Sequence, residues 1–249
     1  MTININDSNI QRTHDLFYLE NDKNLPPKEC FVKIADLIEA HLKNLQDIDK
    51  EINIADFGCA AGQFPGYLDQ RFLSCKVSGY EFLDLLVNAA KSNYPNVNFK
   101  KASILDISAI PESSYDVITV CGVLSIFDEI EPIMNNLSFW IKSGGKLFLF
   151  GTFNPYDIDV FIKYRHSSDY GINKFESGWN IISQKTISNL LKKNGAKNIL
   201  FHKFDLSIDL KKREDDVVRS WTENLEDSSK QIVNGLCIKQ PTYIVEVRF

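Results

Sequence analysis

The feature that most constrains the fold is an alternation of short apolar stretches with longer segments of helical periodicity. Short runs rich in Val, Ile, Phe and Tyr are typical of buried strands. Such runs occur at residues 52–57, 76–81, 96–100, 115–121 and 146–151, and helical patterns lie between most of them. Strands that alternate with helices require right-handed crossovers, so the pattern predicts a largely parallel sheet with helices on both faces.

Local signals place the helices that flank these strands. A helix is expected from Pro26–Pro27 to about Leu45, and another from Asp128, an N-cap candidate with Glu131 three residues on, to about residue 143. A further helix runs from Ser183 to Gly195, where a left-handed C-cap is expected. Residues 242–249 are expected to form the last strand, antiparallel to the others.

We therefore expect an α/β protein with a Rossmann-like, mostly parallel seven-stranded sheet and an antiparallel last strand. Two segments interrupt the alternation: one is rich in Tyr, Phe, Asp and Gly, and the other is strongly charged at first and then mixed. We interpret both as insertions, the first as a lid over the active site. The expected single domain, 1–249, comprises an N-terminal cap and helix (1–45), a cofactor-binding core (46–151), the substrate lid (152–182) and the C-terminal half of the core (183–249), with the second insertion at about 209–240.

The most specific motif is Asp56-Phe-Gly58-Cys-Ala-Ala-Gly62, which stands where the first strand gives way to a helix. Glycines at such a turn let a ligand approach the backbone, and the helix N-terminus offers free N–H groups. Glu81 ends the second strand, where a carboxylate can accept hydrogen bonds from both ribose hydroxyls of an adenosine. A tight turn beside an ordinary surface acid is the alternative, but the order strand, loop, helix, strand and acid favours a nucleotide site.

The loop does not match a dinucleotide fingerprint, because Ala60 and Gln63 occupy two of its glycine positions. It resembles the first motif of class I S-adenosylmethionine-dependent methyltransferases, Asp/Glu-x-Gly-x-Gly-x-Gly, with Ala60 in place of the middle glycine. The resemblance covers residues 52–151: Tyr80-Glu81-Phe82 matches the second motif and residues 115–127 resemble the fourth. In the third motif, residues 96–106, Ser103 stands where the family often has an acid after the third strand. The contact with the adenine is then left to Ser103, the Ile104 backbone or Asp106.

The resemblance implies S-adenosyl-L-methionine as cofactor and S-adenosyl-L-homocysteine as product. It implies the following cofactor-binding residues: Asp56, Gly58, Cys59, Ala60, Gly62, Phe64, Glu81, Phe82, Ser103, Ile104, Cys121 and Gly122. Cys59 and Cys121 are interpreted as small packing residues rather than nucleophiles.

Charge and cysteine content bear on partners. The formal net charge of −5 disfavours a nucleic-acid partner, since binding to phosphates normally needs a basic surface. The five cysteines show no metal-binding or disulfide spacing, so no metal is expected. Residues 1–9 lack the apolar core of a signal peptide and no apolar run could span a bilayer. A cytoplasmic protein with a small-molecule substrate and no membrane contact is expected, in an oligomeric state that these features leave open.

The candidate catalytic residues are histidines. His166 lies in the predicted lid, where the family places substrate-binding residues, and is a candidate general base; a solvent-facing loop residue is the alternative. His14 belongs to an N-terminal segment that in relatives often folds over the cofactor, although a surface helix residue is the favoured interpretation. His41 and His202 are interpreted as structural. The candidate substrate-binding residues are Tyr156, Tyr164, Arg165, Tyr170 and Trp179.

These candidates have alternatives of their own. The aromatic residues are expected either to line the substrate site or only to pack the lid onto the sheet. Arg165 and Lys163 are expected either to bind an acidic group of the substrate or to form a solvated charge pair. Asn154-Pro-Tyr156 is similar to the Asn/Asp-Pro-Pro-Tyr/Phe motif of amino-group methyltransferases, but it follows the fifth strand rather than the fourth, so we treat it as unrelated.

The sequence therefore predicts a methyltransferase that acts on a small molecule, at a hydroxyl oxygen, with a sugar or surface-polysaccharide precursor as one class of acceptor. A protein or RNA methyltransferase is one alternative, and a basic channel beside Cys121 would favour it. A non-catalytic S-adenosylmethionine-binding partner or regulatory protein is another, and a dehydrogenase is disfavoured by the loop.

Overall fold

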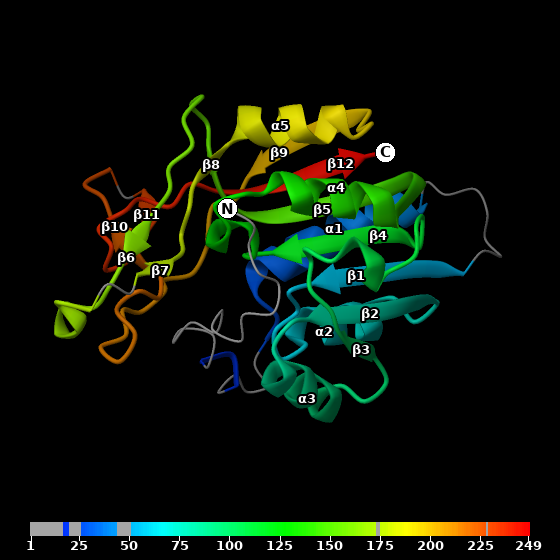
Figure 1. Ribbon diagram of the computed structural model, residues 1–249, viewed down its shortest axis with the longest axis horizontal. Helices are drawn as coiled ribbons and strands as arrows, with labels where there is room; N and C mark the ends of the chain where they lie inside the picture. The colour runs from blue at the N-terminus through cyan, green and yellow to red at the C-terminus, as the bar shows by residue number, and fades with distance from the viewer. Residues whose placement is uncertain (1–16, 20–25, 44–50, 173–174, 228) are drawn as a thin grey trace.

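A twisted sheet of mainly parallel strands runs through the centre of the chain (Figure 1). The structure is a computed structural model that describes residues 17–19, 26–43, 51–172, 175–227 and 229–249. Along its main path the strand order is β3-β2-β1-β4-β5-β12-β9. These strands are β1 (Ile52–Phe57), β2 (Cys75–Glu81), β3 (Asn98–Lys101), β4 (Tyr115–Cys121), β5 (Ile141–Asn154), β9 (Asn198–Lys203) and β12 (Thr242–Arg248).

The last strand reverses direction at the far side of the sheet. β12 pairs antiparallel with β5 on one side and with β9 on the other, whereas β1, β2, β3, β4 and β5 pair in parallel. The short β8 (Ile182–Ser183) adds a parallel pair to the end of β5. The predicted Rossmann-like sheet of seven strands with an antiparallel last strand is confirmed.

Helices cover both faces of the sheet, because alternate side chains of each strand point to opposite faces. One face packs against α1 (Glu29–Lys43) and α2 (Gln63–Arg71), with Ala90 of α3 (Asp84–Asn93) in the same cluster. The other face packs against α4 (Glu131–Trp140) and α5 (Gln184–Lys193). Short 3-10 turns occupy Ile107–Ala109, Leu124–Ile126 and Ser167–Asp169.

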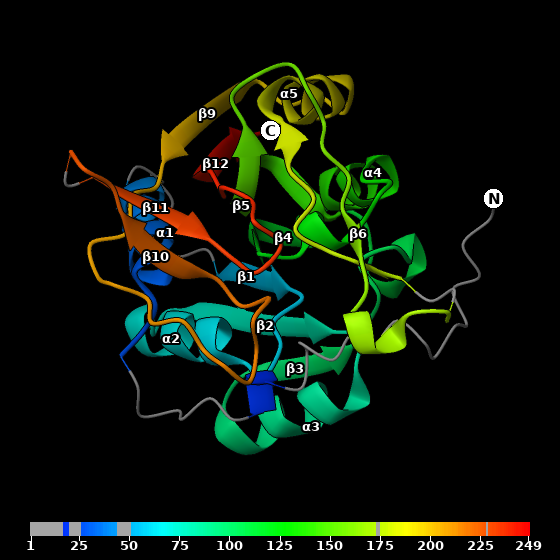
Figure 2. The same cartoon turned by 90° about the vertical axis from the view of Figure 1, so that its left-hand side faces the viewer.

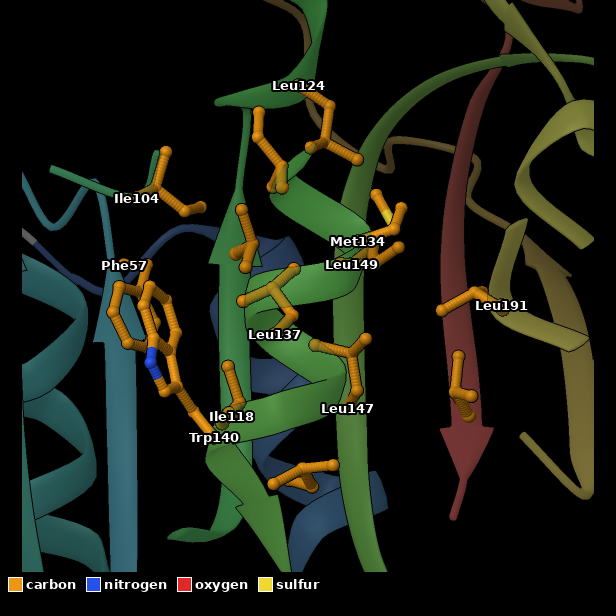
Figure 3. Close-up of a cluster of buried hydrophobic side chains, with 14 of the residues drawn as sticks. Phe57, Ile104, Ile118, Leu124, Met134, Leu137, Trp140, Leu147, Leu149 and Leu191 are labelled. Carbon is orange, nitrogen blue, oxygen red and sulfur yellow. The ribbon is translucent and has the colours of Figure 1, made fainter. Parts of the chain in front are cut away.

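The core under α4 fixes the position of the first two strands. The Trp140 ring stacks on Phe57 with centroids 4.7 Å apart, and Phe57 stacks in turn on Tyr80 at 4.9 Å. Figure 3 shows Trp140 and Leu137 of α4 facing Phe57, Ile118 and Leu147 of the sheet. This packing holds the ends of β1 and β2, from which the glycine loop and Glu81 extend.

Two expected boundaries were wrong. α4 begins at Glu131 with Ile130 as N-cap, not at Asp128, and it ends at Trp140. The carboxylate of Asp128 instead bonds with Lys163, Ser177 and Asn180, so long-range contacts take the group that a local cap would have used. β5 begins directly after the helix and extends to residue 154, beyond the expected 146–151 at both ends.

The other expected helices agree with the structure within the part of the chain that it describes. α1 begins two residues after the prolines, and Leu45 lies outside the described residues. Ser183 caps α5 by accepting a hydrogen bond from the Thr186 N–H, and Gly195 after this helix has φ +88°.

The two segments expected as insertions each contain a small antiparallel hairpin. β6 (Lys163–Tyr164) pairs with β7 (Glu176–Ser177), and β10 (Trp221–Asn224) pairs with β11 (Lys230–Val233). Both hairpins lie beyond the carboxyl ends of the parallel strands, on the left of Figure 1 and facing the viewer in Figure 2. In doubly wound sheets, ligands bind at this edge.

Candidate functional site: the loops at the carboxyl edge of the sheet

The loop after β1 has a backbone that suits a closely approaching ligand. Gly58, Ala60 and Gly62 all have positive φ, at +71°, +47° and +85°. Gly62 is the N-cap of α2 and offers no side-chain cap, so the first-turn N–H groups are left for other acceptors. The Gly58 and Cys59 N–H groups donate to the Tyr80 carbonyl at 2.8 and 3.1 Å, which ties the loop to β2.

Glu81 lies at the end of β2 with only 9% of its surface exposed. One carboxylate oxygen accepts from the Ala60 N–H at 3.0 Å, and the other accepts from Phe82 N–H at 2.7 Å and Leu83 N–H at 3.0 Å. These bonds join the glycine loop to the start of α3 through one carboxylate. The three hydrogen bonds hold the carboxylate in a fixed orientation at the end of β2.

Asp56 is the second carboxylate beneath the loop. It is 3% exposed and accepts a hydrogen bond from the Thr119 hydroxyl at 2.6 Å. Burial, opposed by the Thr119 hydrogen bond and assisted by the nearby Glu81 charge, raises its pKa to about 7. Two acids of the same sign therefore lie close to the place where the glycine loop would meet a ligand.

Loops after β3 and β4 complete this edge. Gly122 has φ +74° and a Cβ at this position would meet no atom within 4 Å, so space is open beside it. A Cβ on Gly58 would lie 2.3 Å from Cγ2 of Val123, which shows that the loops after β1 and β4 touch. Burial raises the pKa of the Cys59 and Cys121 thiols well above the usual value, which is consistent with packing residues.

The segment after β3 keeps its own polar groups engaged. The Ser103 hydroxyl accepts from the Leu105 N–H at 3.2 Å, and the Ile104 carbonyl accepts from the Asn136 side chain at 2.9 Å. Asp106 accepts from the Ser108 N–H and hydroxyl. The contact of one of these three residues with an adenine stays a prediction.

Phe64 is placed differently from the other expected cofactor residues. Its side chain is 2% exposed and stacks on Phe31 of α1, with ring centroids 4.4 Å apart. The ring therefore belongs to the core between α1 and α2, and only its backbone at the start of α2 is left to face a ligand.

Asn180 anchors the first insertion to the loop after β4, and no sequence pattern predicts this role. Its backbone N–H donates to Ser125 O at 2.8 Å, and its side-chain amide donates to Phe127 O at 3.0 Å and to Asp128 at 3.1 Å. Its side-chain oxygen accepts from the Ile162 N–H at 2.7 Å. Each partner lies far away in sequence, so no local motif could have revealed the contact.

The expected substrate residues divide into a clustered group and an exposed group. The Tyr164 hydroxyl donates to Glu176 at 2.7 Å, and its ring makes edge contacts with Trp179 and His166, with centroids 6.0 and 6.5 Å away. Trp179 has φ +58°, an uncommon conformation for a bulky residue. Tyr156 and Tyr170 are exposed, at 73% and 83%.

The remaining candidates have distinct surroundings. The Arg165 guanidinium lies over the rings of Tyr170 and Phe175, and His166 is exposed before a 3-10 turn. His14 lies outside the described residues. His202, interpreted as structural, contacts Glu246 at 3.0 Å. The Asn154 side chain bonds to Ile158 O and Tyr156 N–H, so it stabilises its own turn.

Two further properties bear on the type of site. Within the described ranges, no group of three His, Cys, Asp or Glu side chains could hold a metal ion. No helix there is both long and apolar enough to cross a membrane.

Three features are typical of a Rossmann-like domain of the class I methyltransferase type: the strand order, the glycine loop after β1, and the acid Glu81 at the end of β2. Residues 55–149 match the family described as "Methyltransferase domain". The matched segment contains the glycine loop, Glu81 and the loop after β4.

Curated and solved relatives agree with this assignment. The chain is 29% identical to malonyl-[acyl-carrier protein] O-methyltransferase 1 of Ilyobacter polytropus over 107 residues, which cover 42% of this chain and 39% of the relative. The chain thus spans less than half the length of the curated relatives it matches.

Solved structures share the fold. A S-adenosylmethionine-dependent methyltransferase of Methanosarcina mazei is 13% identical, with a TM-score of 0.56 over 85% of this chain and 96% of its own. The CurJ carbon methyltransferase is 11% identical, with a TM-score of 0.58 over 88% of this chain and 53% of its own.

Proposed function

We propose that this protein transfers the methyl group of S-adenosylmethionine to a hydroxyl oxygen of a small molecule. The observation that most supports the cofactor is the pair of carboxylates, Asp56 and Glu81, beneath the glycine loop. A dinucleotide would bring the negative charges of a pyrophosphate toward them. S-adenosylmethionine brings a positively charged sulfonium, which the carboxylate of Glu81 attracts.

Particular residues would hold this cofactor. Glu81 would accept hydrogen bonds from the ribose hydroxyls, since its carboxylate is already oriented by three backbone N–H groups. The backbone from Gly58 to Gly62 would lie along the methionine part, and Gly122, with open space beside it, would face the other side. Residues 103–106 would lie at the adenine.

When bound, the cofactor supplies a methyl carbon that is made electrophilic by its sulfonium. The protein's task is then to hold the acceptor oxygen in line with that carbon and to exclude water. A lone pair of this oxygen forms the new carbon–oxygen bond while the carbon–sulfur bond breaks, and its electrons stay on sulfur. The hydroxyl proton passes to a base, for which His166 is our candidate.

Three observations support a small acceptor and attack by oxygen. The first insertion is fixed over the carboxyl edge by Asn180 and carries aromatic residues suited to a small molecule. The net charge of −5 disfavours a nucleic acid. The curated relative from Ilyobacter polytropus is named as an O-methyltransferase. Sugar or surface-polysaccharide precursors remain our first class of acceptor, and five free cysteines fit a reducing cytoplasm.

The test is calorimetric titration with S-adenosylmethionine and S-adenosylhomocysteine, using native protein, Glu81→Ala and the control Asp84→Ala. Asp84 is close in sequence to Glu81, but its exposed carboxylate pairs with Lys101. We expect Glu81→Ala to weaken binding by more than about 100-fold, since two charge-assisted hydrogen bonds are lost. Asp84→Ala should bind like native protein. Failure of the folded native protein to bind either compound would contradict the proposal.

A further inference from the structure

Two basic residues of the first insertion, Lys163 and Arg165, have different surroundings. Lys163 forms an ion pair with Asp128 of the loop after β4. Arg165, two residues on, forms no ion pair with a carboxylate among the residues that the structure describes. Its one hydrogen bond there goes to the Ile172 carbonyl at 3.3 Å. The charge of Lys163 is therefore used within the protein, whereas that of Arg165 is left for an external anion.

Next to Arg165, the β6–β7 hairpin contacts the loop after β4. Lys163 is paired with Ser177 and Tyr164 with Glu176, and directly opposed residues share a face of a hairpin. Both Lys163 and Ser177 contact Asp128, so their face is turned toward the loop after β4. Arg165 follows directly after Tyr164, the last paired residue of β6, and so stands next to this contact.

Two aromatic rings hold the guanidinium in place. The Cζ atom of Arg165 is 5.1 Å from the centroid of Tyr170 and 5.1 Å from that of Phe175. Such contacts orient a guanidinium without neutralising its charge, and they leave its planar N–H fork free for two parallel hydrogen bonds. Tyr170 and Phe175 are themselves 83% and 51% exposed, so the group lies at an open, apolar surface.

From this geometry we infer that the methyl acceptor carries a carboxylate or phosphate, and that Arg165 binds this group. The inference rests on the proposed function and adds a substrate class to it. The acceptor hydroxyl and its anionic group belong to the same molecule, with the anion bound next to the end of β6. A carboxylate or a phosphate matches the guanidinium fork, and a neutral amide does not. Arg165 thus selects the acceptor, while the cofactor loops make the methyl group available.

The experiment uses acceptors in matched pairs that differ only in charge: hydroxybenzoates against hydroxybenzamides, and hexose 6-phosphates against hexoses. Each is titrated into the complex with S-adenosylhomocysteine and then tested for transfer of labelled methyl from S-adenosylmethionine. The variants are Arg165→Gln, Arg165→Lys and the control Lys185→Gln, which removes an exposed lysine paired with Asp157 at the start of α5.

We expect binding and methyl transfer only with anionic members of the pairs. Arg165→Gln should lower kcat/KM for them by roughly 10- to 100-fold, chiefly through KM, with unchanged affinity for S-adenosylmethionine. Arg165→Lys should retain part of the activity, and Lys185→Gln all of it. Three outcomes overturn the inference: no anionic member binds, neutral members react equally well, or Arg165→Gln behaves like Lys185→Gln. In each case the test with Glu81→Ala still decides the cofactor separately.

Discussion

The two sides of the candidate site differ in how completely the protein satisfies its own polar groups. On the cofactor side, Glu81 and Asp56 are each bonded to groups from neighbouring strands and loops. On the side of the two insertions, which we propose as the acceptor side, the second insertion buries the side-chain N–H groups of Asn234 and Gln240 with no hydrogen-bond partner among the described residues. The cofactor side is complete before any ligand binds, whereas the acceptor side retains unused capacity.

This difference indicates which side of the site determines stability and which determines ligand affinity. A preorganised site binds its ligand without a large ordering cost, and it also stabilises the fold around it. A region with buried polar groups left unpaired is less stable by about 1–3 kcal/mol for each group. We therefore expect changes on the cofactor side to affect stability and cofactor affinity together. Changes on the acceptor side should alter stability without altering the affinity for the cofactor.

The largest effect is expected for Gly58→Ala. The new methyl group would lie 2.3 Å from Val123 Cγ2, at a residue with φ +71°. Overpacking and backbone strain together should lower the free energy of unfolding by roughly 3 kcal/mol and abolish binding of S-adenosylmethionine. Chemical denaturation and calorimetry measure the two quantities.

A matched control separates strain from the clash. Gly144→Ala introduces alanine at φ +82° with no atom within 4 Å of the new Cβ, so it should cost only about 1 kcal/mol and leave binding intact. Val123→Ala should recover part of the stability lost by Gly58→Ala. If Gly58→Ala and Gly144→Ala behaved alike, the contact between the two loops would have no role.

Asn180→Ala should have an intermediate effect and should affect only the acceptor side. The change leaves the Ile162 N–H and the Phe127 carbonyl without the partners described above, which should lower the free energy of unfolding by about 2 kcal/mol. We expect KM for the acceptor to rise while the affinity for S-adenosylmethionine is retained. Equal losses of both would show that the two sides are not separable. Asn154→Ala, in the exposed turn of the same insertion, is the control.

The last prediction concerns the pH dependence of stability. The pKa of Asp56 in the folded protein is about 7, above its ordinary value of 3.8, so between these values the folded state holds a proton that the unfolded state has released. Stability should therefore fall as pH rises through this window, by up to about 1.4 kcal/mol per pH unit. Asp56→Asn should remove this part of the slope in denaturation curves measured from pH 4 to 7. An unchanged slope would mean that Asp56 is ionised throughout.

Features that depend on local sequence could be predicted, and features that depend on contacts between distant segments could not. β1 and β4 have the predicted bounds, since continuous apolar runs followed by glycine identify buried strands locally. The start of α4 was mispredicted, because Asp128 bonds with residues of the first insertion instead of capping the helix. The glycine loop and Glu81 could be located by spacing alone. Asn180 and the orientation of Arg165 depend on contacts between distant segments, which no local pattern encodes, and the lid role of residues 152–182 stays a prediction.

The reversed direction of β12 has a consequence for how this protein could diversify. β9 runs parallel to β5 and ends at the carboxyl edge, and β12 starts at that same edge, where Phe204 N–H bonds to Thr242 O. Any chain added between them emerges above the cofactor loops without disturbing a strand (Figure 2). The connection from β5 to α5 opens at the same edge. Sequence can therefore be gained, lost or exchanged in two places that both face the reacting atoms, so new acceptor preferences can arise while the machinery for the methyl donor is inherited unchanged.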